Sequence, residues 1–137
     1  MVVADALHSA AIRLLRGVRK EDEATGVGPA RLSALSVLVF AGPMRLTELA
    51  RIEQVKPPTM TKIVAGLETA GLVKRDGDAD DARAVRIEAT ARGRTLLQKG
   101  RRRRVDRLAS ALERLDSAEL EILARAAAII ERVASAI

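Results

Sequence analysis

Apolar and polar positions follow the clearest pattern in residues 54–75, QVKPPTMTKIVAGLETAGLVKR. The apolar residues recur at i, i+3, i+4 and i+7, which places them on one helical face: Met60, Ile63, Val64 and Leu67. Two prolines stand at the start, where the N–H groups that proline lacks would have no helical partner. Gly71 stands where a helix ends. The pattern predicts an amphipathic helix followed by a strand that opens at Leu72.

The same reasoning predicts five further helices, over residues 2–20, 30–41, 48–52, 91–115 and 119–137. Thr47 is expected to cap the short third helix, and Thr90 the long helix that follows the strands. Asp116-Ser117 separates the last two helices. In the second helix, four side chains are expected to point inward: Leu32, Leu35, Val39 and Phe40.

Two short strands are expected over residues 72–76 and 84–88, and Met44-Arg45 forms a short extended piece. In the second strand, Val85 and Ile87 alternate with Arg86 and a glutamate, which is the period of a half-buried strand. The turn-forming sequence GDADDAR lies between the strands. The predicted fold class is mainly α with a small two- to three-stranded β wing, a winged helix-turn-helix flanked by N- and C-terminal dimerisation helices.

The terminal helices are apolar over more than one stripe, so they need burial on a second side. A two-fold homodimer would supply it, and a thick three-helix packing within one chain is the alternative. We expect a single domain over residues 1–137. Residues 30–95 would form the winged lobe, and residues 1–25 and 96–137 the dimerisation region.

Composition excludes several classes of function. The chain has no cysteine, so it has neither a disulfide nor a thiol redox switch, and its one histidine is too few for a histidine-rich metal site. No cofactor or metal is therefore expected. No apolar run approaches the roughly 18 residues of a membrane span, and no signal peptide opens the chain, so a cytoplasmic location without membrane contact is expected.

The positive charge is concentrated in the central part of the chain. Formal net charge is 0 over residues 1–30, +8 over residues 31–104 and −2 over residues 105–137. The outer face of the predicted helix at 57–69 is small, hydroxylated and basic, and carries no carboxylate before Glu68. Such a face suits double-stranded DNA, although an amphipathic helix with a polar outer face can also be an ordinary surface helix.

With these elements placed, the sequence resembles the MarR family of transcriptional regulators from about Arg31 to Arg94. The resemblance rests on the order and spacing of four motifs: LTELA at 46–50, PPTMTK at 57–62, LETAGLVKR at 67–75, and DAR at 81–83 followed by TARG at 90–93. It implies a homodimeric winged helix-turn-helix regulator that represses genes from an inverted-repeat operator. It also implies release by a small phenolic or lipophilic anion.

The resemblance also implies roles for particular residues. Thr59, Thr61 and Lys62 would enter the major groove, while Arg31, Thr47 and Lys56 would contact phosphates. Arg83 resembles the wing arginine that reaches the minor groove, and Asp81 would orient its guanidinium. The complete expected DNA-binding set is Arg31, Thr47, Lys56, Pro57, Thr59, Thr61, Lys62, Arg75, Asp81, Arg83 and Arg86.

The chain departs from the family pattern at three positions: Lys56 replaces a common serine, Gly66 a larger polar residue, and Ala89 a usual leucine. A ligand crevice is expected where the terminal helices meet the lobe, lined by Arg16, Leu35, Val39 and Phe40. Arg101–Arg104 form a run of four arginines inside the long helix. That run is read as a solvated flank, with a phosphate contact or an anion-binding wall as alternatives.

Two competing functions can be weighed against a DNA-binding repressor. A winged-helix module for protein–protein assembly would not need the concentration of positive charge in residues 31–104. An enzyme would need a catalytic histidine with an acidic partner, a phosphate-binding glycine loop or a metal set, and the sequence offers none of these. The sequence therefore predicts a regulator and not an enzyme.

Overall fold

The computed structural model describes residues 1–77 and 85–137. It contains two compact units, Met1–Arg104 and Val105–Ile137, which are described separately. The first unit holds all elements up to the long helix α5 (Ala91–Leu112), which ends in the second unit. Its helices are α1 (Val2–Arg19), the 3₁₀ helix η1 (Lys20–Thr25), α2 (Pro29–Ala41), α3 (Leu46–Ile52) and α4 (Pro57–Thr69).

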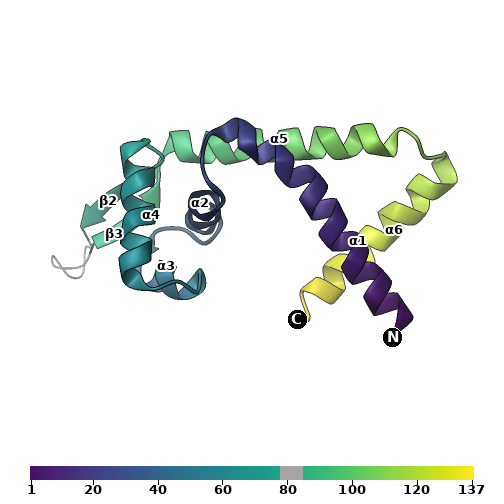
Figure 1. The fold of residues 1–137 in the computed structure, drawn as a ribbon, viewed down its shortest axis with the longest axis horizontal. Coiled ribbons are helices and arrows are strands. Elements are labelled where there is room, and N and C mark those ends of the chain that lie inside the picture. The colour runs from purple at the N-terminus through teal and green to yellow at the C-terminus, as the bar shows by residue number, and fades with distance from the viewer. Residues whose placement is uncertain (78–84) are drawn as a thin grey trace. The chain divides into compact units, whose positions relative to one another are not determined.

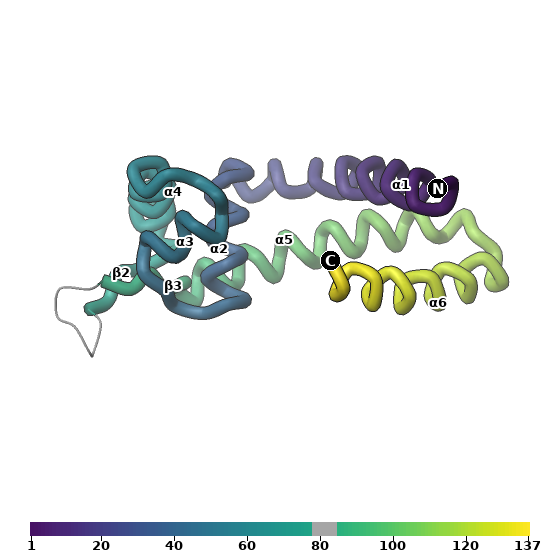
Figure 2. The backbone as a smooth tube through the Cα atoms, turned by 90° about the horizontal axis from the view of Figure 1, so that it is seen from below, coloured from purple at the N-terminus to yellow at the C-terminus, as the bar shows by residue number. Residues whose placement is uncertain are grey.

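Three strands complete the first unit: β1 (Met44–Arg45), β2 (Val73–Gly77) and β3 (Val85–Ala89). They form an antiparallel sheet in the order β1-β3-β2. In the register, Met44 lies opposite Ile87 and Val73 lies opposite Ala89. Figure 1 shows this small sheet beside α4, and Figure 2 shows α2, α3 and α4 grouped next to it. The predicted winged helix-turn-helix fold is confirmed.

One apolar core joins α2, α3, α4 and the sheet. The predicted inner face of α4 is confirmed, because Met60, Val64 and Leu67 are fully buried and Ile63 is half-buried. The largest buried side chains outside α4 are Leu35, Leu49, Leu72 and Ile87. Since no aromatic residue contributes, this core is built from aliphatic side chains and methionine alone.

The second helix buries a different face from the one expected. Its fully buried residues are Ala34, Leu35 and Leu38, and Phe40 is 80% exposed. At 100° per residue, Phe40 lies about 200° around the helix from Leu38, so the two cannot face the same core. Val39 is half-buried. The inward prediction was therefore correct for Leu35 and wrong for Phe40.

The predicted N-cap of α3 was also wrong. The helix begins at Leu46, one residue before Thr47, and Arg45 occupies the cap position without a side-chain hydrogen bond to the helix. Arg45 is still paired with Arg86 in the sheet and has extended backbone angles (φ −72°, ψ 152°). The chain thus passes directly from strand to helix, which leaves Thr47 exposed in the first helical turn.

Thr90 joins three elements at the start of α5. Its hydroxyl donates to the carbonyl oxygen of Gly71 at 2.7 Å and accepts from the backbone N–H of Gly93 at 3.1 Å. Its own N–H donates to the carbonyl oxygen of Leu72 at 3.0 Å. The predicted cap is therefore confirmed, and the same residue ties α5 to the end of α4 and to the start of β2.

The second unit contains the end of α5 and the last helix, α6 (Ser117–Ala134). Asp116 caps α6 in a reciprocal box, because its carboxylate accepts from the N–H of Glu119 at 2.8 Å while the Glu119 carboxylate accepts from the N–H of Asp116 at 3.1 Å. The predicted break at Asp116 is confirmed, although α5 ends at Leu112, before the expected residue 115, and α6 begins at Ser117, before the expected residue 119. Neither α1 nor α6 contains a buried residue.

Among the described residues, no single helix is long and apolar enough to cross a membrane. The segments Val2–Thr25 and Pro29–Ala41 reach the necessary length and composition only jointly, and they are bent by 92°.

Gly93 is predicted to be essential for the packing of α5. A Cβ at this position would overlap the carbonyl oxygen of Leu72 and would lie 3.1 Å from Cδ1 of Leu35. Gly93→Ala should therefore lower the free energy of unfolding by about 1–3 kcal/mol, as overpacking does in other cores. Urea denaturation at one fixed protein concentration measures this. Gly17→Ala is the matched control, because nothing lies within 4 Å of the added Cβ. An unchanged midpoint for Gly93→Ala would contradict the prediction.

Candidate nucleic-acid interface

The outward face of α4 is fixed by the burial of its inner face. With Met60, Val64 and Leu67 in the core, Thr59 and Lys62 are exposed. Neither side chain has a hydrogen bond or ion pair with any residue that the structure describes. On the exposed face of α4, this hydroxyl and this ammonium can bind acceptors and anions outside the protein.

Thr61 differs from Thr59 in its hydrogen bonding. Its hydroxyl donates to the carbonyl oxygen of Pro57 at 3.0 Å, one turn earlier in α4. The proton of Thr61 is therefore used within the helix, and its oxygen can offer only lone pairs to a ligand. Thr59 retains both its donor and its acceptor capacity.

The start of α4 carries Lys56 and Pro57, both exposed. Lys56 occupies the N-cap position and makes no side-chain cap hydrogen bond, as its replacement of a capping residue predicts. Pro57 is the first helical residue, so its missing N–H costs the helix no hydrogen bond. The Lys56 ammonium thus stands at the positive end of α4, where an anion is favoured.

Arg31 reaches α4 from the first turn of α2. Its guanidinium occupies the space in which a side chain at position 66 of α4 would begin. Arg31 and Lys62 line one surface groove of about 280 Å³ together with Gly28, Pro29, Ala30 and Ile63. Neither cation has a partner among the described residues. The fold therefore brings together two cations that are 31 positions apart in the sequence.

Arg75 is placed differently, because it already has an acidic partner. Its Nε lies 3.2 Å from both carboxylate oxygens of Glu68, near the end of α4. In the strand register, Arg86 of β3 lies opposite Asp76 of β2 and Arg45 of β1. Of the wing residues expected to contact DNA, Asp81 and Arg83 lie outside the described residues and remain predictions.

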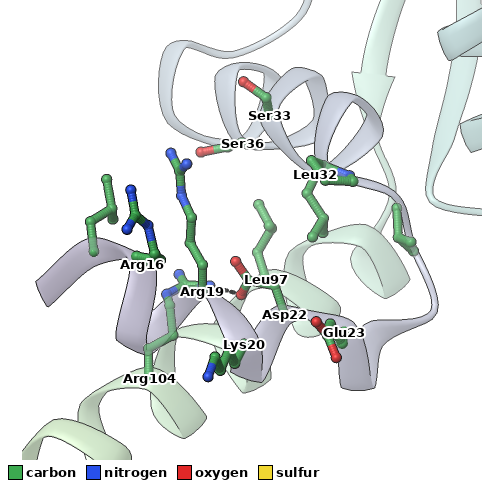
Figure 3. Close-up of a pocket in the computed structure, with 13 residues that line it drawn as sticks. Arg16, Arg19, Lys20, Asp22, Glu23, Leu32, Ser33, Ser36, Leu97 and Arg104 are labelled. Carbon is green, nitrogen blue, oxygen red and sulfur yellow. Dashed lines mark hydrogen bonds and ion pairs between the residues drawn. The ribbon is translucent and has the colours of Figure 1, made fainter. Parts of the chain in front are cut away.

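A second cavity, of about 660 Å³, lies among α1, η1, α2 and α5 in the first unit (Figure 3). Its apolar walls include Leu15, Leu32 and Leu97, and Ser33 and Ser36 line its α2 side. Its charged side chains are four cations and two carboxylates: Arg16, Arg19, Lys20, Arg104, Asp22 and Glu23. Basic groups therefore outnumber acidic ones in the lining.

Only part of the expected ligand crevice matches this cavity. Arg16 lines it, as predicted, but Leu35, Val39 and Phe40 do not. Leu35 is fully buried in the core, and the cavity is lined by the α2 face that carries Leu32, Ser33 and Ser36. The spacing of these three, i, i+1 and i+4, was a visible signal of a shared face.

The arginine run in α5 is divided by the fold. Arg104 is partly buried and pairs with Asp22 of η1, with Nη1 and Oδ1 2.5 Å apart, whereas Arg101 and Arg102 are exposed. The predicted solvated flank therefore holds for Arg101 and Arg102, which are exposed. Arg104 instead forms part of a cavity wall.

Comparison with known proteins identifies the family. The model of the MarR family matches residues 29–85, which run from the start of α2 through α4 and β2 to the first residue of β3. An HTH-type transcriptional regulator of Mycobacterium tuberculosis is 36% identical over 125 residues, which is 91% of this chain and 87% of the relative. The chain belongs to the MarR family. It is therefore a DNA-binding transcriptional regulator, and its family is not one of enzymes.

One further relative and two solved structures extend the comparison. The HTH-type transcriptional repressor MdtR of Bacillus subtilis is 32% identical over 71 residues, 52% of this chain and 46% of that protein. A transcriptional regulator of Thermotoga maritima superposes with a TM-score of 0.83 at 26% identity, covering 97% of this chain and 96% of that one. A MepR-like protein, solved with pseudoligands, gives a TM-score of 0.58 at 28% identity, covering 96% and 92%.

We predict that Glu68→Gln strengthens the binding of any DNA duplex. The substitution removes a negative charge near the outward face of α4 and frees the Arg75 guanidinium, so the salt dependence should become steeper. Because both side chains are more than a third exposed, the free energy of unfolding should change by less than about 1 kcal/mol. Fluorescence anisotropy on a random duplex at several salt concentrations measures the effect.

Glu121→Gln is the matched control, since it breaks the comparable Glu121–Arg125 pair of α6 and changes the net charge equally. Weaker DNA binding by Glu68→Gln than by wild type would show that Glu68 orients Arg75 toward DNA.

Proposed function

We propose that this MarR-family protein is a cytoplasmic repressor that binds an inverted-repeat operator as a homodimer. The observation that carries the proposal is the exposed face of α4, where Thr59 and Lys62 have no partner among the described residues and Arg31 lies alongside. Thr59 and Lys62 would read base edges in the major groove, while Arg31, Thr47 and Lys56 would hold the backbone. The repressor name of the Bacillus subtilis relative supports the direction of regulation.

Homodimer formation is supported by the apolar surface of the terminal helices. In α1, Val3, Leu7 and Leu14 are 76%, 37% and 54% exposed. In α6, Ile122 and Ile129 are 65% and 51% exposed. Helices that leave this much apolar surface in water are stabilised when a second copy covers it. A two-fold dimer would also present two copies of α4 to two half-sites.

We further propose that a small, weakly acidic aromatic compound binds the 660 Å³ cavity and releases the operator. Arg16 and Arg19 line the cavity and have no ion-pair partner among the described residues, so a bound carboxylate would find uncompensated positive charge. The leucines of its walls suit an aromatic ring. A pseudoligand complex of a MepR-like protein supports a ligand site in this fold.

The operator proposal predicts specific and strongly salt-dependent DNA binding. The protein should bind a pseudo-palindromic duplex from the DNA flanking its own gene, with half-sites roughly 10 base pairs apart centre to centre. Binding should weaken with a log–log slope of about −0.9 for each phosphate neutralised. Mobility shift and footprinting measure this against a random duplex of equal length. Equal affinity for both duplexes would contradict specific operator binding and would favour a protein–protein assembly module.

The ligand proposal predicts reciprocal coupling between ligand and operator. A salicylate-like anion that prefers the DNA-free protein a hundredfold shifts the equilibrium by about 2.7 kcal/mol per site. Arg16→Ala should reduce the loss of operator affinity that the anion causes. Arg13→Ala is the matched control, because it removes the same charge from α1 at a residue that does not line the cavity. Equal affinity of the compound for free and operator-bound protein would rule this mechanism out for that compound.

A further inference from the structure

Gly66 is an unusual residue to find inside α4, because glycine destabilises a helix interior relative to alanine. The structure shows what occupies the vacant position. A Cβ built on Gly66 would overlap Cζ, Nε and Nη2 of Arg31, whose guanidinium therefore rests directly on the helix backbone. The clash would involve the far end of a flexible side chain, so alanine can be accommodated if Arg31 moves away.

The resting place of Arg31 adjoins Lys62, one turn earlier in α4. Both cations line the 280 Å³ groove, and the six described residues that form it include no carboxylate. Arg31 and Lys62 also lack an ion-pair partner among the described residues. Two like charges in one groove repel each other, so this arrangement favours an anion that both can bind.

We propose that Gly66 is a positioning residue for DNA binding, because its missing side chain seats Arg31 beside Lys62 to hold one backbone phosphate. The planar guanidinium can donate two parallel hydrogen bonds to phosphate oxygens, and the ammonium of Lys62 adds a point charge. Lys62 then contacts this phosphate and not a base edge, which leaves base reading to Thr59. A phosphate contact of this kind sets the register of α4 in the groove and carries no base preference. The inference rests on the proposed function.

Gly66→Ala separates this role from a structural one. If Gly66 were needed for folding, the substitution would lower the thermal midpoint, whereas a positioning role predicts lower DNA affinity without that loss. Alanine has the higher helix propensity, so the thermal midpoint should stay equal or rise. DNA affinity should nevertheless fall roughly tenfold, for operator and random duplex alike, because a phosphate contact is lost. The log–log salt slope should become less steep by up to about 1.8 per dimer, which is the loss of about 0.9 for each of two phosphates, since Lys62 still faces each phosphate.

Gly17→Ala is the matched control, since it makes the same change in α1 where nothing lies within 4 Å of the new Cβ. Arg31→Ala should reproduce the loss of affinity and slope, and adding Gly66→Ala to it should cause no further loss. This double-mutant cycle would assign the loss of DNA affinity to the displacement of Arg31 and not to a shift of α4.

The outcomes distinguish this inference from the proposed function. Equal affinity of the wild-type protein for the candidate operator and for random DNA would overturn the proposed function, which is specific operator binding. If wild type binds its operator specifically but Gly66→Ala keeps its affinity and salt slope, only the positioning role is overturned. A loss confined to operator DNA, with random DNA unaffected, would overturn the phosphate contact in favour of base recognition.

Discussion

The first unit depends on the junction at Thr90. Three hydrogen bonds of Thr90, 2.7 to 3.1 Å long, join the segment between α4 and β2 to the first turn of α5. The carbonyl oxygen of Leu72 accepts from Thr90 and also lies against Gly93, where no side chain would fit. The exit of α4 and the direction of α5 are therefore set at one point. The exposed face of α4 keeps its orientation because its end cannot move independently of the sheet.

The elements that the sequence predicted well are those with local physical causes. The apolar spacing of Met60, Val64 and Leu67 decides which face of α4 is buried, whatever surrounds it. The caps at Thr90 and Asp116 use atoms three residues away. Local signals failed where pairing in the sheet determined the start of a helix. Thr47 does not cap α3, because Arg45 pairs with Arg86 in the sheet and α3 begins at the next residue.

The candidate sites were harder to predict because their contacts join residues distant in the sequence. Asp22 and Arg104 are 82 positions apart, and no periodicity connects them. Charge counts have the same weakness. The net charge of +8 over residues 31–104 does not show that Arg75 is paired with Glu68 and Lys74 with Asp76 and Glu88. Only the fold determines which cations already have an acidic partner and which, such as Lys62, have none among the described residues.

The first turn of α2 connects the two candidate sites. Pro29 lines both the groove beside α4 and the larger cavity, and Arg31 and Leu32, two adjacent residues, face one site each. Adjacent residues of a helix are separated by 100°, so one short turn can form a wall of both spaces. A ligand that displaces this turn by entering the cavity would also displace Arg31 relative to Lys62. Coupling between an effector and DNA then needs no long pathway, because a single turn of helix carries the side chains that both would contact.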